Sequence, residues 1–330
     1  MEQIRYSGRR FAEVLGLSAR ELADAEERGL VHSTIAPAGP TQKILYSMED
    51  LAAARAALSR VPPRRPMRRQ LFLNFKGGTG KTSVSSSYAF RLAEMGHRVL
   101  VIDLDSQGHA SKCLGVQGEE AEKTLFDAII KKTPLDTVIL KTGMPGLDLV
   151  PSNLSMSTID LSLMPLAARE FRLRNVLKEV EGTYDYAVLD APPSFGLLNL
   201  NALMAAHDLF VPVLPDFLSF HGLKLLFETV QGLEEDLEHV LDHIFIVINA
   251  YNATYKIAKE AKEALTKHYP EFLLKQVIRQ CTKFARASSE GIPIFAFDSE
   301  SKGAQDIQAV LDEVQARIGA PVRLKAVESA

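Results

Sequence analysis

A glycine-rich loop between an apolar run and a helix-like segment is the feature that most constrains this chain. The run LFLNF at 71–75 is typical of a short buried strand, and SVSSSYAFRLAEMG at 83–96 is typical of a helix that ends at a glycine. Between them, Gly77, Gly78 and Gly80 let the backbone curl until successive N–H groups face an anion. The chain is therefore predicted to fold here as strand, phosphate loop and helix, with the anion at the positive end of the helix.

The end of this loop matches the pattern G-x-x-x-x-G-K-[ST], and its beginning does not. Gly80, Lys81 and Thr82 occupy the last fixed positions, which predicts Lys81 at the β- and γ-phosphates and the Thr82 hydroxyl on Mg²⁺. Phe75 replaces the first glycine, and a second lysine, Lys76, follows it. From the residues alone two interpretations of Lys76 stay open: a cation that reaches the nucleotide of a partner subunit, or a solvated loop residue.

Further apolar runs alternate with helix-length segments and indicate an α/β fold. The runs are VLVIDLD, LDLVPS, YAVLDAPP, LFVPVLP and IFIVINA. Strands buried on both faces look like this, and their alternation with helices predicts a mostly parallel sheet with helices on both faces. Because ligands bind at the carboxyl ends of such strands, Asp103, Asp105 and Asp190 are predicted to join the phosphate loop at one edge. Asp190 is predicted at the Mg²⁺ site, with Asp105 beside it to hold or activate the attacking water.

The composition of the chain argues against some classes of protein. Of 330 residues, 46% are hydrophobic, which is enough for a sizeable core, and the formal net charge of −3 argues against a generally basic nucleic-acid binder. A net charge of −3 is nevertheless compatible with a local basic patch. Cys113 and Cys281 lack metal-type spacing and fit a reduced cytoplasm. No apolar stretch reaches the roughly 18 residues of a membrane span, so a cytoplasmic protein is expected.

Changes of pattern divide the chain into three parts. Residues 1–60 are predicted to form a small domain, with helices that begin after Ser18 and Ser47. Residues 61–70, VPPRRPMRRQ, combine three prolines with arginines and are predicted to form a basic linker whose arginines are possible DNA phosphate contacts. Residues 71–330 form the predicted nucleotide-binding domain.

The loop KGGTGKT resembles the deviant phosphate loop of the ParA/MinD group of P-loop NTPases. VLVIDLDSQGHASKCLG at 99–115 resembles the D-x-D-x-Q segment of ParA-type partition ATPases, and YDYAVLDAPPSFG at 184–196 resembles their Mg²⁺-site strand. NALMAAHDLFVPVLPDFLSFHGLKLL and ASSEGIPIFAFDSESKGAQDIQAVLDEV resemble later segments. The likeness covers about 70–318.

The resemblance implies slow Mg²⁺-dependent ATP hydrolysis that a ParB-like or cargo-adaptor protein stimulates. It also implies a homodimer in the ATP state, in which Lys76 contacts the nucleotide of the other subunit, and it places Asp105 in hydrolysis. The predicted nucleotide contacts are Lys76, Gly77, Gly78, Thr79, Gly80, Lys81, Thr82 and Ser83, and the predicted metal ligands are Thr82, Asp105 and Asp190.

ParA-type ATPases bind DNA without sequence preference, which requires cations that neutralise phosphates. Basic residues are concentrated between 256 and 286. The alternative is a solvated helical face, because Glu260 and Glu263 interleave with the lysines. The candidates are Lys256, Lys259, Lys262, Lys267, Lys275, Arg279, Lys283 and Arg286.

The N-terminal part resembles a MerR-type winged helix-turn-helix, through FAEVLGLSARELADAEERGLV and the later YSMEDL. Its recognition helix would cover 19–28. That segment carries Glu21, Asp24, Glu26 and Glu27, whereas DNA readers present Arg, Lys, Asn or Gln. A partner-binding or dimerising role therefore stays open beside operator recognition.

The main prediction is a nucleotide switch that partitions or positions a plasmid, a chromosome region or a protein cluster over the nucleoid. A MinD-like membrane ATPase is one alternative. It needs an amphipathic C-terminal helix, but the tail ARIGAPVRLKAVESA is broken by Gly319 and Pro321, so no membrane partner is expected. An electron-transfer ATPase of the nitrogenase-iron-protein type would need paired cysteine ligands. An ATP-regulated transcription factor is the remaining class.

Overall fold

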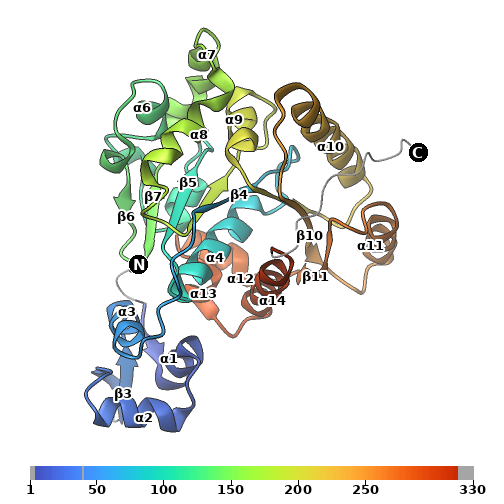
Figure 1. The fold of residues 1–330 in the computed structure, drawn as a ribbon. Helices are drawn as coiled ribbons and strands as arrows, with labels where there is room; N and C mark the ends of the chain where they lie inside the picture. Colours follow the sequence, from blue (N-terminus) through green and yellow to red (C-terminus); the bar gives the residue numbers. More distant parts are fainter. Residues whose placement is uncertain (1–3, 39–40, 319–330) are drawn as a thin grey trace.

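The computed structural model describes residues 4–38 and 41–318 and has a small N-terminal unit joined to a larger α/β unit (Figure 1). The N-terminal unit combines three helices with an antiparallel sheet of order β1-β3-β2. Ser18 and Ser47 each begin a helix through a capping box, as predicted. Its elements are β1 (Tyr6–Ser7), α1 (Gly8–Leu15), α2 (Ala19–Glu27), β2 (Thr34–Ala38), β3 (Thr41–Tyr46) and α3 (Met48–Ala57).

An eight-stranded sheet of order β11-β10-β9-β4-β8-β5-β7-β6 forms the centre of the larger unit. All its ladders are parallel except the one between β6 and β7. Six strands match the predicted apolar runs, and β6 and β11 were not predicted. The strands are β4 (Arg68–Phe72), β5 (Val99–Asp103), β6 (Leu140–Lys141), β7 (Leu147–Val150), β8 (Tyr186–Asp190), β9 (Asp208–Val213), β10 (His243–Tyr251) and β11 (Leu273–Arg279).

Helices cover both faces of this sheet, as predicted. Successive strand residues enter different clusters: Phe72 packs with α4 and α14, whereas Leu71 and Leu73 pack with α8, α9 and α10. The two layers lie on opposite sides of the strands in Figure 1. The helices are α4 (Lys81–Glu94), α5 (His109–Cys113), α6 (Leu125–Ile129), α7 (Ile159–Leu163), α8 (Arg172–Leu177), α9 (Leu197–Ala205), α10 (Leu218–Leu237), α11 (Lys256–His268), α12 (Lys283–Ser289), α13 (Ile294–Asp298) and α14 (Lys302–Arg317).

Glu94, the last residue of α4, joins the N-terminal unit to the α/β unit. Its buried carboxylate accepts hydrogen bonds from Arg10 of α1, at 2.8 Å, and from Arg91 one turn earlier. Arg55 of α3 donates to the backbone oxygens of Val14 and Glu94, both at 2.7 Å. Removing one partner of such a buried ion pair is strongly destabilising, because the other charge is left uncompensated. The two units are therefore held together by a specific interface.

The predicted linker at 61–70 is wrong in its last three residues, which begin β4. Both Nε and Nη2 of Arg68 bind the carboxylate of Asp208 at 2.6 Å, and Arg69 pairs with Glu181. Arg65 donates to the Tyr186 hydroxyl at 2.9 Å. These guanidinium groups are engaged at the amino edge of the sheet, which argues against their suggested role in contacting DNA. Their partners are more than 100 residues away in sequence, so local pattern could not reveal them.

Candidate functional site

The phosphate loop joins the carboxyl end of β4 to the first turn of α4 (Figure 1). All the predicted nucleotide contacts lie in this loop or in that turn. Gly78 and Gly80 have φ angles of 73° and 85°, in the left-handed region that glycine adopts without strain. Gly80 precedes the first helical residue, so the unpaired N–H groups of α4 and its positive dipole end are directed at the loop.

Lys81 is a buried cation at the start of α4, with 7% of its surface exposed. Its Nζ donates to the backbone oxygen of Lys76 at 3.3 Å, and it forms no ion pair within the described residues. Burial lowers the pKa of Lys81, against the opposing effect of the Asp190 and Asp105 charges. A buried ammonium group with a neutral acceptor is a favourable place for an anion.

Asp190, the last residue of β8, lies beside the first turn of α4. Its Oδ2 accepts a hydrogen bond from the Thr82 hydroxyl at 2.7 Å, and its Oδ1 accepts one from Ser85 at 2.8 Å. Asp103 is its neighbour across the β5–β8 ladder. Burial raises the pKa of Asp190 to about 6 and that of Asp103 to about 7. These hard oxygen donors suit Mg²⁺, whose charge would compensate the buried carboxylates.

Asp105 lies just beyond the end of β5, at the same edge of the sheet. Its Oδ1 accepts a hydrogen bond from the backbone N–H of Gln107 at 3.0 Å, and its own N–H donates to Asp103. Asp105 is partly exposed, unlike Asp103. Its carboxylate is therefore anchored by the loop and accessible to water, as a water-holding role requires; that role stays a prediction.

The Lys76 side chain is held outside its own loop. Its Nζ lies 2.7 Å from Oδ2 of Asp216, beyond the end of β9, and both side chains are about one-third exposed. Partial burial raises the pKa of Asp216, but hydrogen bonds from Lys76 and Ser219 outweigh it and hold that pKa below its usual value. Lys76 thus contributes its backbone oxygen to Lys81 and directs its ammonium group to another strand end.

Sequence reasoning missed three polar residues of this edge. Asp216 binds Lys76, Ser85 binds Asp190, and Asn249 near the end of β10 donates to the backbone oxygen of Thr79 at 2.8 Å. Asp216 and Asn249 end or follow the apolar runs LFVPVLP and IFIVINA. The strand-end argument that identified Asp190 therefore applies to them as well, whereas Ser85 has no distinguishing signal within a serine-rich turn.

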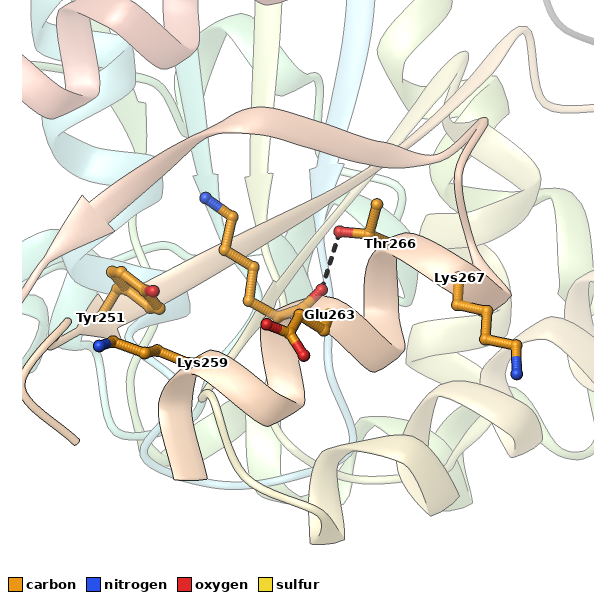
Figure 2. A pocket seen from close by; sticks show the side chains of 6 residues that line it. Tyr251, Lys259, Glu263, Thr266 and Lys267 are labelled. Carbon is orange, nitrogen blue, oxygen red and sulfur yellow. Dashed lines mark hydrogen bonds between the residues drawn. The ribbon is translucent and has the colours of Figure 1, made fainter. Parts of the chain in front are cut away.

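A second group of predicted residues surrounds a hollow of about 450 Å³ between β10 and α11. We call the residues that line it the lysine surface: Tyr251, Lys259, Lys262, Glu263, Thr266 and Lys267. Figure 2 draws these side chains and labels Tyr251 on β10 and Lys259, Glu263, Thr266 and Lys267 on α11. The Lys262 Nζ lies 5.4 Å from the centre of the Tyr251 ring. None of the three lysines forms an ion pair with another described residue, so three positive charges remain uncompensated beside Glu263.

The other DNA candidates differ in how strongly they are engaged. Arg279 is bound by both carboxylate oxygens of Asp306, and Lys283 lies 2.8 Å from Asp298. Lys256 pairs loosely with Glu260 at 3.4 Å. In the described part of the chain, the structure gives no ion pair to Lys275 or Arg286. The eight candidates are therefore not equivalent. Some are paired with carboxylates, so the eight do not form one surface of unpaired positive charges.

The surface of α2 keeps the acidic character that its sequence predicted. Glu21, Asp24 and Glu27 are exposed, and Glu26 accepts a hydrogen bond from the Tyr46 hydroxyl at 2.7 Å. Glu21 also closes the capping box at Ser18. This helix therefore presents acceptors and negative charge, which suit a basic partner better than DNA phosphates.

Known proteins similar to this chain identify its family. The AAA domain family matches residues 67–243. The cell division protein PomZ of Myxococcus xanthus is 63% identical over 318 residues, which cover 96% of this chain and 95% of PomZ. The chain belongs to the ParA/MinD family. Another relative, the sporulation initiation inhibitor protein Soj of Bacillus subtilis, is 32% identical over 74% of this chain and 96% of Soj. Soj thus matches about three quarters of this chain, whereas PomZ also matches most of the rest.

Solved structures agree with the P-loop NTPase fold. An ATP complex of McdA from Cyanothece has a TM-score of 0.69 at 20% identity, covering 78% of this chain and 99% of McdA. Cobyrinic acid a,c-diamide synthase from Mycobacterium smegmatis, with an ATP analogue and magnesium, has a TM-score of 0.68 at 24% identity, covering 78% and 100%. Among the described helices, none is long and apolar enough to span a membrane. Most of the C-terminal tail, residues 319–330, lies outside the described residues.

Proposed function

We propose that this chain is a Mg²⁺-dependent ATPase. The observation that carries the proposal is the buried Lys81, whose ammonium group has a neutral acceptor and no described ion-pair partner. The phosphates of ATP supply the missing negative charge. Thr82 and Asp190 are proposed to hold Mg²⁺, with Asp105 at the same edge to position the attacking water. When bound, Mg²⁺ neutralises charge that develops on the transferred phosphoryl group. The ligands named for McdA and the diamide synthase support this assignment.

The ATP-bound protein is proposed to be a dimer that closes over the nucleotide edge. Large apolar side chains are exposed after the carboxyl ends of three strands of the sheet: Leu154 after β7, Phe195 after β8 and Phe217 after β9, all more than half exposed. Exposed apolar groups gathered at one edge favour burial in an interface. In the dimer, Lys76 leaves Asp216 and contacts the nucleotide of the partner, as the deviant phosphate loop implies.

Dimerisation is proposed to switch on non-specific DNA binding through the lysine surface, aided by Lys275 and Arg286. Two copies double the uncompensated positive charge that DNA phosphates meet. The cargo is proposed to be part of the cell division apparatus, because PomZ is a cell division protein. A ParB-like protein or cargo adaptor would stimulate hydrolysis and release the dimer from the nucleoid. The N-terminal unit is proposed to be a MerR-like helix-turn-helix fold that serves as a docking platform for a protein partner.

Fluorescence anisotropy with two unrelated DNA duplexes tests this function. With MgATP, both duplexes should bind equally, and log K should fall with log salt at a slope of about −0.9 per phosphate contact. With ADP or without nucleotide, binding should be much weaker. Equal affinity with and without ATP, or a strong preference for one sequence, would contradict the proposal.

A further inference from the structure

Strand β10 passes the phosphate loop at its carboxyl end, and Asn249 bridges the two. The Asn249 Nδ2 donates to the backbone oxygen of Thr79 at 2.8 Å, across 170 positions of sequence. A Cβ atom on Gly80 would lie 2.1 Å from the same nitrogen. The amide of Asn249 therefore lies directly against the glycine that precedes α4. It touches the loop from the side of β10.

This hydrogen bond fixes the direction of the Thr79–Gly80 peptide. The peptide is planar and trans, so its carbonyl and its N–H point in opposite directions. Because Asn249 holds the carbonyl, the Gly80 N–H is aimed away from β10. Donors at the start of a helix after a glycine loop are those that bind a phosphate. One loop donor is thus held in a fixed direction by a side chain of β10.

The residue that follows Asn249 is strained. Ala250 has a φ of 52°, in the left-handed region that disfavours a residue with a side chain. The register between β10 and β11 also shifts between Ile248 and Tyr251. Strain of this kind persists where the surrounding structure requires it, and it is concentrated at functional sites. Here it turns the chain after Asn249, leaving the amide against the loop while Tyr251 goes on to line the lysine surface (Figure 2).

We propose that Asn249 is a positioning residue of the nucleotide site. Its amide orients the Thr79–Gly80 peptide in advance, so the loop binds phosphates without first having to order that peptide. The inference rests on the proposed ATP binding. Asn249 acts through the loop, so its loss should weaken nucleotide binding and leave the hydrolysis step unchanged. A neutral hydrogen bond of this kind corresponds to an effect of about three- to tenfold on a binding constant.

The test compares Asn249→Leu with Asn249→Ala in the full chain. Leucine approximates the size and shape of asparagine but cannot donate a hydrogen bond, whereas alanine removes the contact entirely. The dissociation constant of MgATP should rise about three- to tenfold in both variants, with kcat at saturating ATP within about twofold of the unaltered protein. Asn252→Ala is the matched control, because Asn252 bonds to Gln280 and Thr254 and not to the loop. Its ATP affinity should not change.

Three results would overturn the inference. One is normal ATP affinity in both Asn249 variants, and another is weak binding in Asn249→Ala with normal binding in Asn249→Leu, which would indicate packing alone. The third is a fall in kcat that parallels a lower thermal midpoint, which would indicate a general structural role. Circular dichroism identifies a variant that does not fold, and Asn249→Ser then replaces it under the same criteria. ATP binding by the unaltered protein is measured first, because its absence would refute the proposed function instead.

Discussion

The nucleotide edge and the lysine surface both present cations, but they hold them in different ways. At the nucleotide edge Lys81 is 7% exposed, and the polar groups around it are fixed by contacts from five strand ends. On the lysine surface Lys259 and Lys267 are exposed, with no described acidic partner. A buried cation without a counter-charge requires one anion at one place, whereas exposed cations act through their summed field. Single substitutions should therefore abolish function at the first region and reduce it gradually at the second.

Lys81→Ala should have the largest effect. Removing one partner of a buried charged contact costs about 3–5 kcal/mol, which corresponds to a loss of roughly 10²- to 10⁴-fold in ATP affinity. Fluorescence titration with MgATP measures this loss. Unchanged ATP affinity in Lys81→Ala would contradict the assignment of a phosphate loop. It would also show that the two regions do not differ in how they hold their cations.

Asp105→Ala should separate ATP binding from hydrolysis. The carboxylate is proposed to position water in the transition state, so turnover should fall roughly 10²-fold while ATP still binds. Phosphate release and ATP titration on the same sample provide the two quantities. Ser106→Ala, one position further along, is the neighbouring control. Normal turnover in Asp105→Ala would exclude the residue from hydrolysis.

DNA binding by the lysine surface should weaken in proportion to the positive charge that is removed. Lys259→Glu with Lys262→Glu should weaken DNA binding at least tenfold, equally on unrelated sequences, and lower the salt slope by about 1.8 for each subunit of the dimer. Lys123→Glu with Lys178→Glu reverses two exposed lysines outside the lysine surface and is the matched control. Anisotropy should show loss in the first pair alone. Equal loss in both pairs would mean that total charge matters and not this surface.

Asp216→Ala should have the smallest effect. The Lys76–Asp216 pair is about one-third exposed, and pairs of that kind contribute about 0.2–1 kcal/mol. Releasing Lys76 should leave ATP affinity of the monomer unchanged and strengthen the ATP dimer by no more than about fivefold. Sedimentation across a range of concentrations measures the dimer. A dimer weakened tenfold would show that Asp216 serves the interface itself.

Much of the fold followed from the sequence because continuous apolar runs and capping serines are local signals. The strand β11 escaped prediction because LLKQVIR lies at the sheet edge and exposes Lys275 and Arg279. Its apolar residues come in two adjacent pairs, so the segment lacks the alternation that would indicate a half-buried strand. The start of β4 was missed because Arg68 is held there by Asp208, a partner that is known only once the strands are paired.

The residues of the candidate site also differ in whether local sequence identifies them. The loop glycines, Lys81, Thr82 and Asp190 form a pattern fixed in sequence, and the structure brings all of them to one edge. Asp216 and Asn249 depend on the strand order, which places β9 beside β4 and β10 beside β9. Sequence distances of 140 and 170 residues conceal such contacts until the topology is known.

Lys76 is proposed to contact the nucleotide of the partner subunit. Asp105→Ala should accumulate an ATP-bound dimer, and adding Lys76→Ala to that background gives the direct test by analytical ultracentrifugation with MgATP. The doubly substituted protein should be a monomer whose ATP affinity lies within about threefold of the protein with Lys76, since Lys81 and the loop still hold the phosphates. A dimer that persists without Lys76, or a monomer that no longer binds ATP, would contradict it.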